Sequence, residues 1–363
     1  MAPSPAREAD RQLPLGEEIF LDHVGHFVDD AKSASDALIR AGFAPAPAAI
    51  HTSPDPGGGA PQPTGTGNVT AMLTRGYIEA LFKTADTPLG REIDAATARY
   101  AGLHLAAFVV ADAASAHRRL ATGGFRVQPL VEMERPVSIE VGQDTATSAS
   151  PPPCGEGLGV GVGSYADATP RGTTPLLIPP PPPGRLRPSS TGYRGRETTA
   201  VAAFSIARLV PGEMPEGRIQ ILTHRTEPLV WQPRWLSHRN GAVGLASIVI
   251  AVADVSEAAE RFARFTGRKA RPTASGQTID LDRGRVELVD AAALAEMLPE
   301  IPLPALPFIA AYGIKVRSVE SLESILKQNG LAARRQGEHL VAPFPPELGH
   351  GAWLFSAAGA DPR

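Results

Sequence analysis

The sequence predicts an α+β fold made of four copies of one βαβββ module, and three repeated features indicate it. An apolar strand that ends at an acidic or hydroxyl residue occurs four times, at 21–30, 103–112, 245–254 and 309–318. That last residue can cap a helix, because its side chain accepts hydrogen bonds from free backbone N–H groups. A glycine follows at nearly constant distance, where a helix can end in the left-handed conformation. The caps are Asp30, Asp112, Asp254 and Ser318, and the glycines are Gly42, Gly124, Gly267 and Gly330. Such regularity indicates a duplicated supersecondary unit.

The last strand of each module recurs as well. Each copy begins with a glycine and continues as an apolar or alternating run, which suits a half-buried strand of a sheet. These strands start at Gly76, Gly217, Gly284 and Gly351. The second module is much longer than the others because it contains a segment of different composition, from about residue 138 to residue 198.

This segment is rich in proline and glycine. It contains Pro151–Pro153, a glycine at every second position from Gly155 to Gly163, and the run Pro179–Pro183. Such a composition cannot bury enough apolar surface to offset the entropy lost on ordering, which predicts disorder or polyproline II structure. A phosphate-binding loop is the alternative, but the spacing G-x-G-x-x-G is not met and no GK[ST] follows. We therefore predict a disordered insertion inside the second module.

A polar turn at 235–242 separates the second module from the third. Two modules on either side give two predicted domains, residues 18–238 and residues 239–360. Residues 1–17 are predicted to form a disordered tail.

Composition narrows the classes of function. Hydrophobic residues make up 43% of the chain and the formal net charge is −3, which does not indicate a nucleic-acid partner. The single cysteine, Cys154, excludes an internal disulfide and a cysteine-rich metal site, in agreement with a reducing compartment. The first residues lack the apolar core of a signal peptide, and no run reaches the length of a membrane span. We expect a cytoplasmic protein without a membrane partner, and the richness in Ala, Gly, Pro and Arg suggests a bacterial gene.

The repeated module resembles the building block of the vicinal oxygen chelate superfamily, which includes glyoxalase I, extradiol dioxygenases and bleomycin-resistance proteins. The opening strand L-D-H-V-x-x-x-V-x-D from Leu21 and the closing strand G-Y-I-E from Gly76 carry this resemblance. The stretch 226–245 resembles bacterial glyoxalase-like domain proteins in particular. The resemblance covers about 280 of the 363 residues, all except the tails and the insertion. It implies that the modules pair into two glyoxalase-like half-barrels with cupped surfaces.

The resemblance also implies where a metal ion would bind, because the family places ligands at one position on the first strand and one on the last strand of each module. In the N-terminal domain these positions hold His23, Glu79, Leu105 and Gln220, and in the C-terminal domain they hold Ser247, Glu287, Ala311 and Leu354. An imidazole, a carboxylate and an amide oxygen form a mixed donor set suited to Zn²⁺, Mn²⁺, Fe²⁺ or Ni²⁺. The resemblance therefore implies a metal site at His23, Glu79 and Gln220, and Glu287 is expected to be a surface carboxylate.

Strand alternation tests this set of ligands. His23 and His26 are three residues apart, so they should point to opposite faces of one strand, with Leu21, Gly25 and Phe27 on the face of His23. Taken singly, His23 is better explained as an ordinary sheet histidine and Glu79 as a solvated carboxylate, and only the two together, at matching family positions 56 residues apart, favour the metal site.

Two further histidines are expected near a substrate. His104, next to Leu105, would need a β-bulge to turn inward. His224 lies four residues beyond Gln220 on the same strand face, near enough to contact a bound substrate but too far to share the ion.

The predicted function is that of a metal-dependent enzyme acting on a small oxygenated molecule in the N-terminal domain, with Glu79 as a proton acceptor. Lyase or isomerase chemistry is favoured over ring cleavage, because an extradiol dioxygenase needs a second histidine. The alternative is a metal-free protein that binds or sequesters a small molecule, as bleomycin-resistance proteins do. Since one chain supplies paired modules, we expect a monomer whose only partner is the small molecule.

Overall fold

The computed structural model describes residues 11–53, 55, 57–141 and 196–359. The predicted insertion, apart from its two ends, and Cys154 lie outside the described residues. By residue contacts the chain divides into one unit of residues 1–139 and 199–363 and another of residues 140–198, and the first unit contains both predicted domains. The domain boundary near residue 238 therefore stays a prediction.

The element order repeats βαβββ four times, as predicted. The first module contains β1 (Ile19–Phe27), α2 (Ala31–Arg40), β2 (Ala49–Ser53), β3 (Gln62–Met72) and β4 (Tyr77–Lys83), and the second contains β5 (Gly102–Val110), α4 (Ala113–Thr122), β6 (Val131–Val141), β7 (Arg196–Arg208) and β8 (Arg218–His224). The third contains β9 (Ala242–Ala251), α6 (Val255–Thr266), β10 (Ala270–Thr273), β11 (Gly276–Asp280) and β12 (Arg285–Val289), and the fourth contains β13 (Phe308–Val316), α8 (Val319–Gln328), β14 (Arg334–Gln336), β15 (His339–Pro343) and β16 (Ala352–Ala357). Connecting elements are α3 (Pro88–Thr97), α5 (Glu227–Val230), η2 (Pro233–Trp235) and α7 (Ala291–Met297), while η3 (Pro346–Leu348) lies within the fourth module.

The helix boundaries follow the predicted chemistry. Each predicted cap residue accepts a hydrogen bond from a backbone N–H of the first turn of its helix, for example Asp30 from Ser33 and Ser318 from Ser321. The glycines that follow the four helices all have positive φ, between +70° and +87°. Both features satisfy backbone groups that a helix end leaves without partners.

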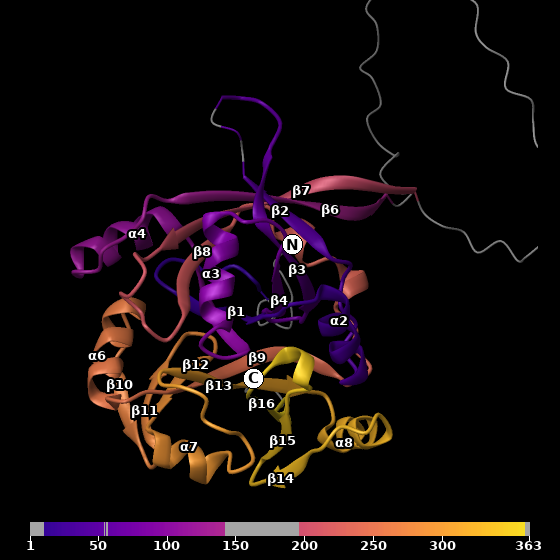
Figure 1. Ribbon diagram of the computed structural model, residues 1–363, viewed down its shortest axis with the longest axis vertical. Coiled ribbons are helices and arrows are strands. Elements are labelled where there is room, and N and C mark those ends of the chain that lie inside the picture. Colours follow the sequence, from indigo (N-terminus) through magenta and orange to yellow (C-terminus); the bar gives the residue numbers. More distant parts are fainter. Residues whose placement is uncertain (1–10, 54, 56, 142–195, 360–363) are drawn as a thin grey trace, which may run out of the picture. The chain divides into compact units, whose positions relative to one another are not determined.

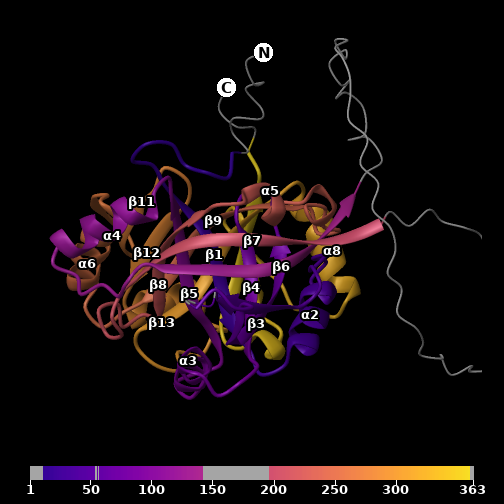
Figure 2. The same cartoon turned by 90° about the horizontal axis from the view of Figure 1, so that it is seen from above.

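The first two modules form a closed barrel of eight strands. The strand order is β1-β4-β3-β2-β6-β7-β8-β5, and β5 pairs antiparallel with β1 to close the ring. The hairpin of β6 and β7 bridges β2 and β8, and its two long strands lie side by side in Figure 2. The resemblance implies a half-barrel here, whereas the two modules complete the ring. An eight-stranded barrel has an interior just wide enough to be filled by side chains or to hold one small ligand.

The last two modules form an open sheet in the order β10-β11-β12-β9-β13-β16-β15-β14, with β9 and β13 antiparallel. These strands, orange to yellow, gather at one side of the molecule in Figure 1. One face of this sheet is covered by α7 and the segment after it: Leu294 of α7, together with Leu298 and Ile301, packs in one cluster with Ala311 and Leu354. The fold class of four paired βαβββ modules is confirmed, and the interior available for a ligand lies in the first pair.

Residues 11–17 belong to the ordered part of the chain. Arg11 forms an ion pair with Glu18, and the buried side chain of Gln12 donates to the carbonyl of Thr74. The ordered chain therefore begins before residue 18, because these side chains find partners on the barrel. No helix among the described residues is long and apolar enough to cross a membrane.

Deleting residues 142–195 and joining Val141 to Arg196 with a short Gly/Ser linker should leave the fold intact. The two ends belong to neighbouring strands, β6 and β7, so a short loop can connect them, and the entropy of loop closure grows only slowly with length. A cooperative thermal transition with the wild-type melting temperature within a few degrees is expected. Loss of that transition would mean that the insertion is part of the folded structure.

Candidate functional site in the N-terminal barrel

Two β-bulges at the contact of β1 and β5 decide which side chains enter the barrel. The register shifts between Leu21 and His23, so Asp22 is an extra residue of β1. Leu21 therefore packs in the outer core rather than on the face of His23, which corrects the prediction from simple alternation. Phe27 does share the interior, and His26 points the other way, as predicted, where it bonds to Leu348 and Tyr312. A bulge breaks the period of two because one strand gains a residue that its partner lacks.

Asp22 lies at the closed end of the barrel interior and joins two histidines. Its side chain is fully buried, and His23 Nδ1 donates to its Oδ2 at 2.7 Å. His224 Nε2 donates to both carboxylate oxygens at 3.1 Å. Burial alone would raise the pKa of Asp22, but the neighbouring His224 and His23 outweigh it and hold the pKa well below its usual value. Asp22 is therefore an ionised carboxylate that holds His23 by its Nδ1, which leaves Nε2 as the nitrogen on the side of Glu79.

The free nitrogen of His23 faces the carboxylate of Glu79. The distance from His23 Nε2 to Glu79 Oε2 is 3.6 Å, and the imidazole stacks on Tyr77 with a centroid separation of 4.3 Å. The other oxygen, Glu79 Oε1, accepts a short hydrogen bond of 2.5 Å from Asn68. Both predicted ligands are buried, so the alternative of a solvated carboxylate does not describe Glu79.

The backbone of the last strand brings Glu79 to this depth. A Cβ on Gly76, whose φ is +81°, would lie 2.5 Å from the carbonyl oxygen of Asp22, so only glycine lets β4 approach β1 so closely. Gly217 has the same relation to the carbonyl of His104 in the second module. The repeated contact shows that Gln220 and Glu79 occupy equivalent positions of their modules.

His51, on β2, is a functional candidate that the sequence analysis misses. Its Nε2 lies 4.0 Å from Glu79 Oε1 and is buried without a hydrogen-bond partner, while its Nδ1 lies 3.1 Å from Thr66 Oγ1. Burial and, to a lesser extent, nearby arginines lower the pKa of His51 to about 4, so its imidazole is neutral at pH 7. Its position on a middle strand matches none of the implied ligand positions, and only the closed barrel brings it to Glu79.

His23, His51, Glu79 and Gln220 all line one small space, which we call the inner cavity. Its volume is about 30 Å³, and the side-chain oxygen of Gln220 is buried there without a partner. Among the described residues, no three His, Cys, Asp or Glu side chains are grouped so that they could hold a metal ion. An ion would therefore need the amide oxygen of Gln220 beside His23 and Glu79. With that unpartnered oxygen included, the donor set fits a divalent ion.

Three arginines, Arg135, Arg208 and Arg218, line the inner cavity. Among the described residues, Arg218 is the one of the three that forms an ion pair, with Glu92 at 2.6 Å. Arg135 contacts the amide oxygen of Asn68 at 3.4 Å and lies over the ring of Phe204.

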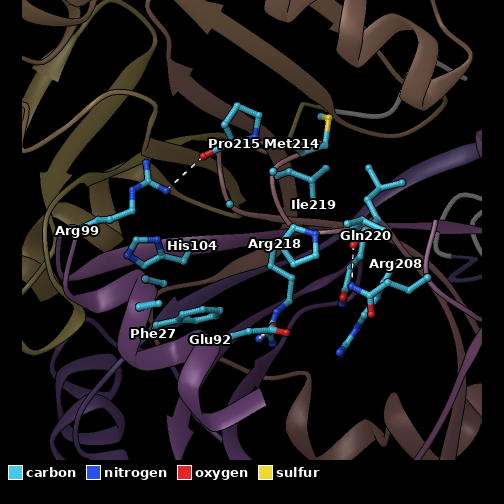
Figure 3. A pocket seen from close by; sticks show the side chains of 18 residues that line it. Phe27, Glu92, Arg99, His104, Arg208, Met214, Pro215, Arg218, Ile219 and Gln220 are labelled. Carbon is cyan, nitrogen blue, oxygen red and sulfur yellow. Dashed lines mark hydrogen bonds and ion pairs between the residues drawn. The ribbon is translucent and has the colours of Figure 1, made fainter. Parts of the chain in front are cut away.

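A larger space adjoins the inner cavity, which we call the outer pocket. It has a volume of about 390 Å³ and lies between α3 and the loop 209–217. Arg208, Arg218 and Gln220 line both spaces, and Figure 3 shows these side chains together with His104 and Phe27.

His104 is the extra residue of the second bulge, on β5, so the bulge that an inward turn requires is present. The ring of His104 lines the outer pocket and not the space beside Glu79. It stacks on Tyr100, and its Nε2 donates to the carbonyl oxygen of Tyr100 at 2.7 Å. His104 is therefore placed to contact a ligand in the outer pocket and not an ion in the inner cavity.

The other candidate residues do not line the inner cavity beside Glu79, with the exception of the apolar Leu105. His224 lies behind Asp22, packed against Tyr77, Phe204 and Trp231, and lines neither space. Glu287 forms an ion pair with Arg285 at 2.7 Å, as expected for a carboxylate without a site. Leu105 packs in the barrel interior, and Ser247 lies buried beside Gly313.

Comparisons with known proteins agree with this architecture. Residues 21–145 match the glyoxalase-like domain family. No curated protein matches the chain. A hypothetical protein from Staphylococcus aureus shares the fold, with 8% identity and a TM-score of 0.54 over 93% of this chain and 99% of that chain.

Two further solved structures align at lower TM-scores. A Mn(II)-bound glyoxalase from Novosphingobium aromaticivorans aligns with 10% identity and a TM-score of 0.46 over 94% of this chain and 82% of that chain. A mutant of 4-hydroxymandelate synthase from Streptomyces coelicolor aligns with 11% identity and a TM-score of 0.44 over 94% of both chains. The family match of residues 21–145 agrees with the resemblance to the vicinal oxygen chelate superfamily, and the Staphylococcus aureus structure shows that the fold occurs in a solved protein.

Proposed function

Because residues 21–145 match the glyoxalase-like domain family, we propose that the protein is a metal-dependent enzyme of that type which acts on a small oxygenated molecule inside the N-terminal barrel. The observation that supports the proposal best is the geometry of the inner cavity. There His23 Nε2 faces Glu79 Oε2 at 3.6 Å, and the unpartnered oxygen of Gln220 lines the same space.

The protein side chains have distinct roles in this proposal. Asp22 holds the His23 imidazole in the tautomer that presents Nε2, an arrangement that commonly orients a metal-binding histidine. His23, Glu79 and Gln220 would hold the ion, which when bound would polarise a carbonyl or bind two adjacent oxygens of a substrate. Glu79 would also serve as the proton acceptor; since Asn68 already donates to Oε1, the oxygen that accepts the proton would be Oε2, which would then have to leave the ion.

Two reaction classes remain candidates, lyase or isomerase chemistry and ring cleavage by a dioxygenase. The preference for lyase or isomerase chemistry rests on the lack of a second histidine, but His51 places one 4.0 Å from Glu79. Two histidines and one carboxylate are typical of non-heme iron dioxygenases, although among the described residues His23, His51 and Glu79 are not grouped so that they could hold one ion together. We therefore propose that carbonyl and catechol substrates are both screened, with the protein loaded with Fe²⁺, Mn²⁺, Ni²⁺ or Zn²⁺ in turn.

A metal-free binding protein is the second candidate function. The observation in its favour is the cluster of Arg135, Arg208 and Arg218 around the inner cavity, since like charges oppose binding of a cation. Metal content distinguishes the two candidates.

Replacing His23 or Glu79 with alanine should remove a stoichiometric divalent ion from the purified protein. Removing one of three donors leaves a site too weak to retain the ion through purification. The measurement is metal analysis by mass spectrometry after dialysis against the candidate ion. Glu287→Ala is the matched control, because this carboxylate holds the equivalent strand position in the third module and should not change the metal content. A wild-type protein that retains no ion would exclude the metalloenzyme and leave the binding protein.

A further inference from the structure

We propose that the outer pocket binds the carboxylate of a small organic anion at Arg208, with the apolar body of the molecule against Phe27 and the loop 209–217. That this anion is also the substrate of the enzyme rests on the proposed function. The binding of the anion itself requires no metal.

The first observation is that Arg208 has no partner. Among the residues that the structure describes, its guanidinium forms no hydrogen bond and no ion pair, and its Nε is buried. Burial and the adjacent Arg218 lower its pKa to about 10, which still leaves the side chain charged at pH 7. The residue as a whole is half-buried, but the Nε end of a guanidinium that is cut off from water without a partner is unfavourable, and proteins normally pair such a group. The missing partner is therefore an anion that comes from outside the chain.

The second observation is the balance of charge around the shared wall of the two spaces. Arg208 and Arg218 line both spaces, while Glu92, the acidic side chain of the outer pocket, is already paired with Arg218. Arg99, at the rim, donates to the carbonyl oxygens of Pro215 and Pro307 and so has its own partners. Arg99 and Arg208 are thus both without a carboxylate partner, but among the described residues lining the outer pocket Arg208 is the arginine that also lacks hydrogen-bond partners. Figure 3 shows its side chain beside Gln220 at the wall of the outer pocket.

The third observation is the shape and lining of the outer pocket. A volume of about 390 Å³ is within the range of small-molecule sites. Phe27, Met214, Ile219 and Leu209 supply apolar surface, and the predicted substrate contact His104 lies on the same wall. A planar guanidinium can bind both oxygens of a carboxylate, which fixes the orientation of the ligand. Because Gln220 lines both spaces, an anion held at Arg208 would place its neighbouring oxygen-bearing carbon toward the inner cavity.

The test uses benzoate as the probe, with benzyl alcohol as its neutral counterpart and inorganic phosphate as the alternative anion. Calorimetric titration of the full-length protein, with and without added Mn²⁺, should show benzoate binding and no binding of benzyl alcohol. Arg208→Met should weaken benzoate at least about tenfold, the loss expected for one charge-assisted hydrogen bond. Arg208→Lys, which keeps the charge but not the planar fork, should retain part of the affinity. Arg225→Met, which removes an exposed arginine paired with Glu132 outside both spaces, should leave the affinity unchanged.

A second readout guards against misfolding. Because Arg208→Met removes an unpaired, half-buried charge, the ligand-free variant should melt at a temperature equal to or higher than that of the wild type. Benzoate binding that survives in Arg208→Met, a wild-type protein that does not bind benzoate, or tighter binding of phosphate than of benzoate would each overturn the inference. Benzoate binding in a protein that retains no metal would support this inference while the proposed metalloenzyme fails.

Discussion

Replacing Asp22 with alanine should lower the free energy of unfolding by about 3–5 kcal/mol, the usual cost of removing one partner from a buried charged network. The carboxylate is fully buried and accepts from His23 Nδ1 and His224 Nε2, so its loss leaves two buried donors without partners. Urea denaturation monitored by circular dichroism measures the loss. Metal affinity should fall as well, by roughly 10–100-fold, because His23 loses the group that orients it.

Two variants make this prediction specific. Asp112→Ala removes an exposed aspartate that caps α4, and it should cost only about 1 kcal/mol. Asp22→Asn keeps one oxygen that can accept from His23 but presents an N–H₂ donor toward His224. Its decrease in unfolding free energy should therefore lie between those of Asp112→Ala and Asp22→Ala. Equal losses for Asp22→Ala and Asp112→Ala would contradict the role given to the buried network.

Lowering the pH from 6.5 to 4 should destabilise the protein strongly, because buried neutral histidines oppose protonation. Burial lowers the pKa of His26 and of His104 to about 4, and it lowers the pKa of His238 as well. Between pH 6.5 and pH 4 the unfolded chain therefore binds protons that the folded chain does not, so stability falls as the pH falls. At pH 5 the first two histidines together should cost about 4 kcal/mol relative to pH 8, and the melting temperature should drop by roughly 6 °C for a chain of this size.

The hydrogen bonds of these histidines explain why they stay neutral. His238 accepts from the backbone N–H of Ala44 at Nδ1 and donates from Nε2 to the carbonyl of Met72, so a second proton would remove the first bond. His26 likewise donates to Leu348 and faces the hydroxyl of Tyr312.

Thermal melts from pH 8 to pH 4 measure the effect, and His350→Gln, which removes an exposed histidine, should leave the profile unchanged. Asp22 does not contribute in this window, because a carboxylate with a lowered pKa loses its stabilising effect only below its unfolded value of 3.8. A melting temperature that stays constant between pH 6.5 and pH 4 would contradict the assignment of neutral buried histidines.

The sequence alone determined the modules, because their signals are local. A cap, a helix and a glycine recur at fixed spacing, and the structure keeps all four helix ends at the predicted residues. The equivalence of Glu79 and Gln220 also follows from the sequence, since each lies three residues after a glycine that packs against the first strand of its module. The approach of His23 to Glu79 follows from the same register, in which Gly25 pairs with Glu79 on adjacent strands.

Only the tertiary structure decided the rest of the site. The bulges at Asp22 and His104 move side chains between faces, and strand alternation cannot reveal them because one extra residue reverses the pattern beyond it. His51 reaches Glu79, and Arg208 reaches the wall beside Gln220, because the β6–β7 hairpin closes the ring and turns one face of every strand inward. In an open sheet these side chains would lie on separate strands of an exposed surface. Closure therefore converts an ordinary histidine into a neutral donor and an ordinary arginine into an unpaired, half-buried cation, through desolvation that no local pattern encodes.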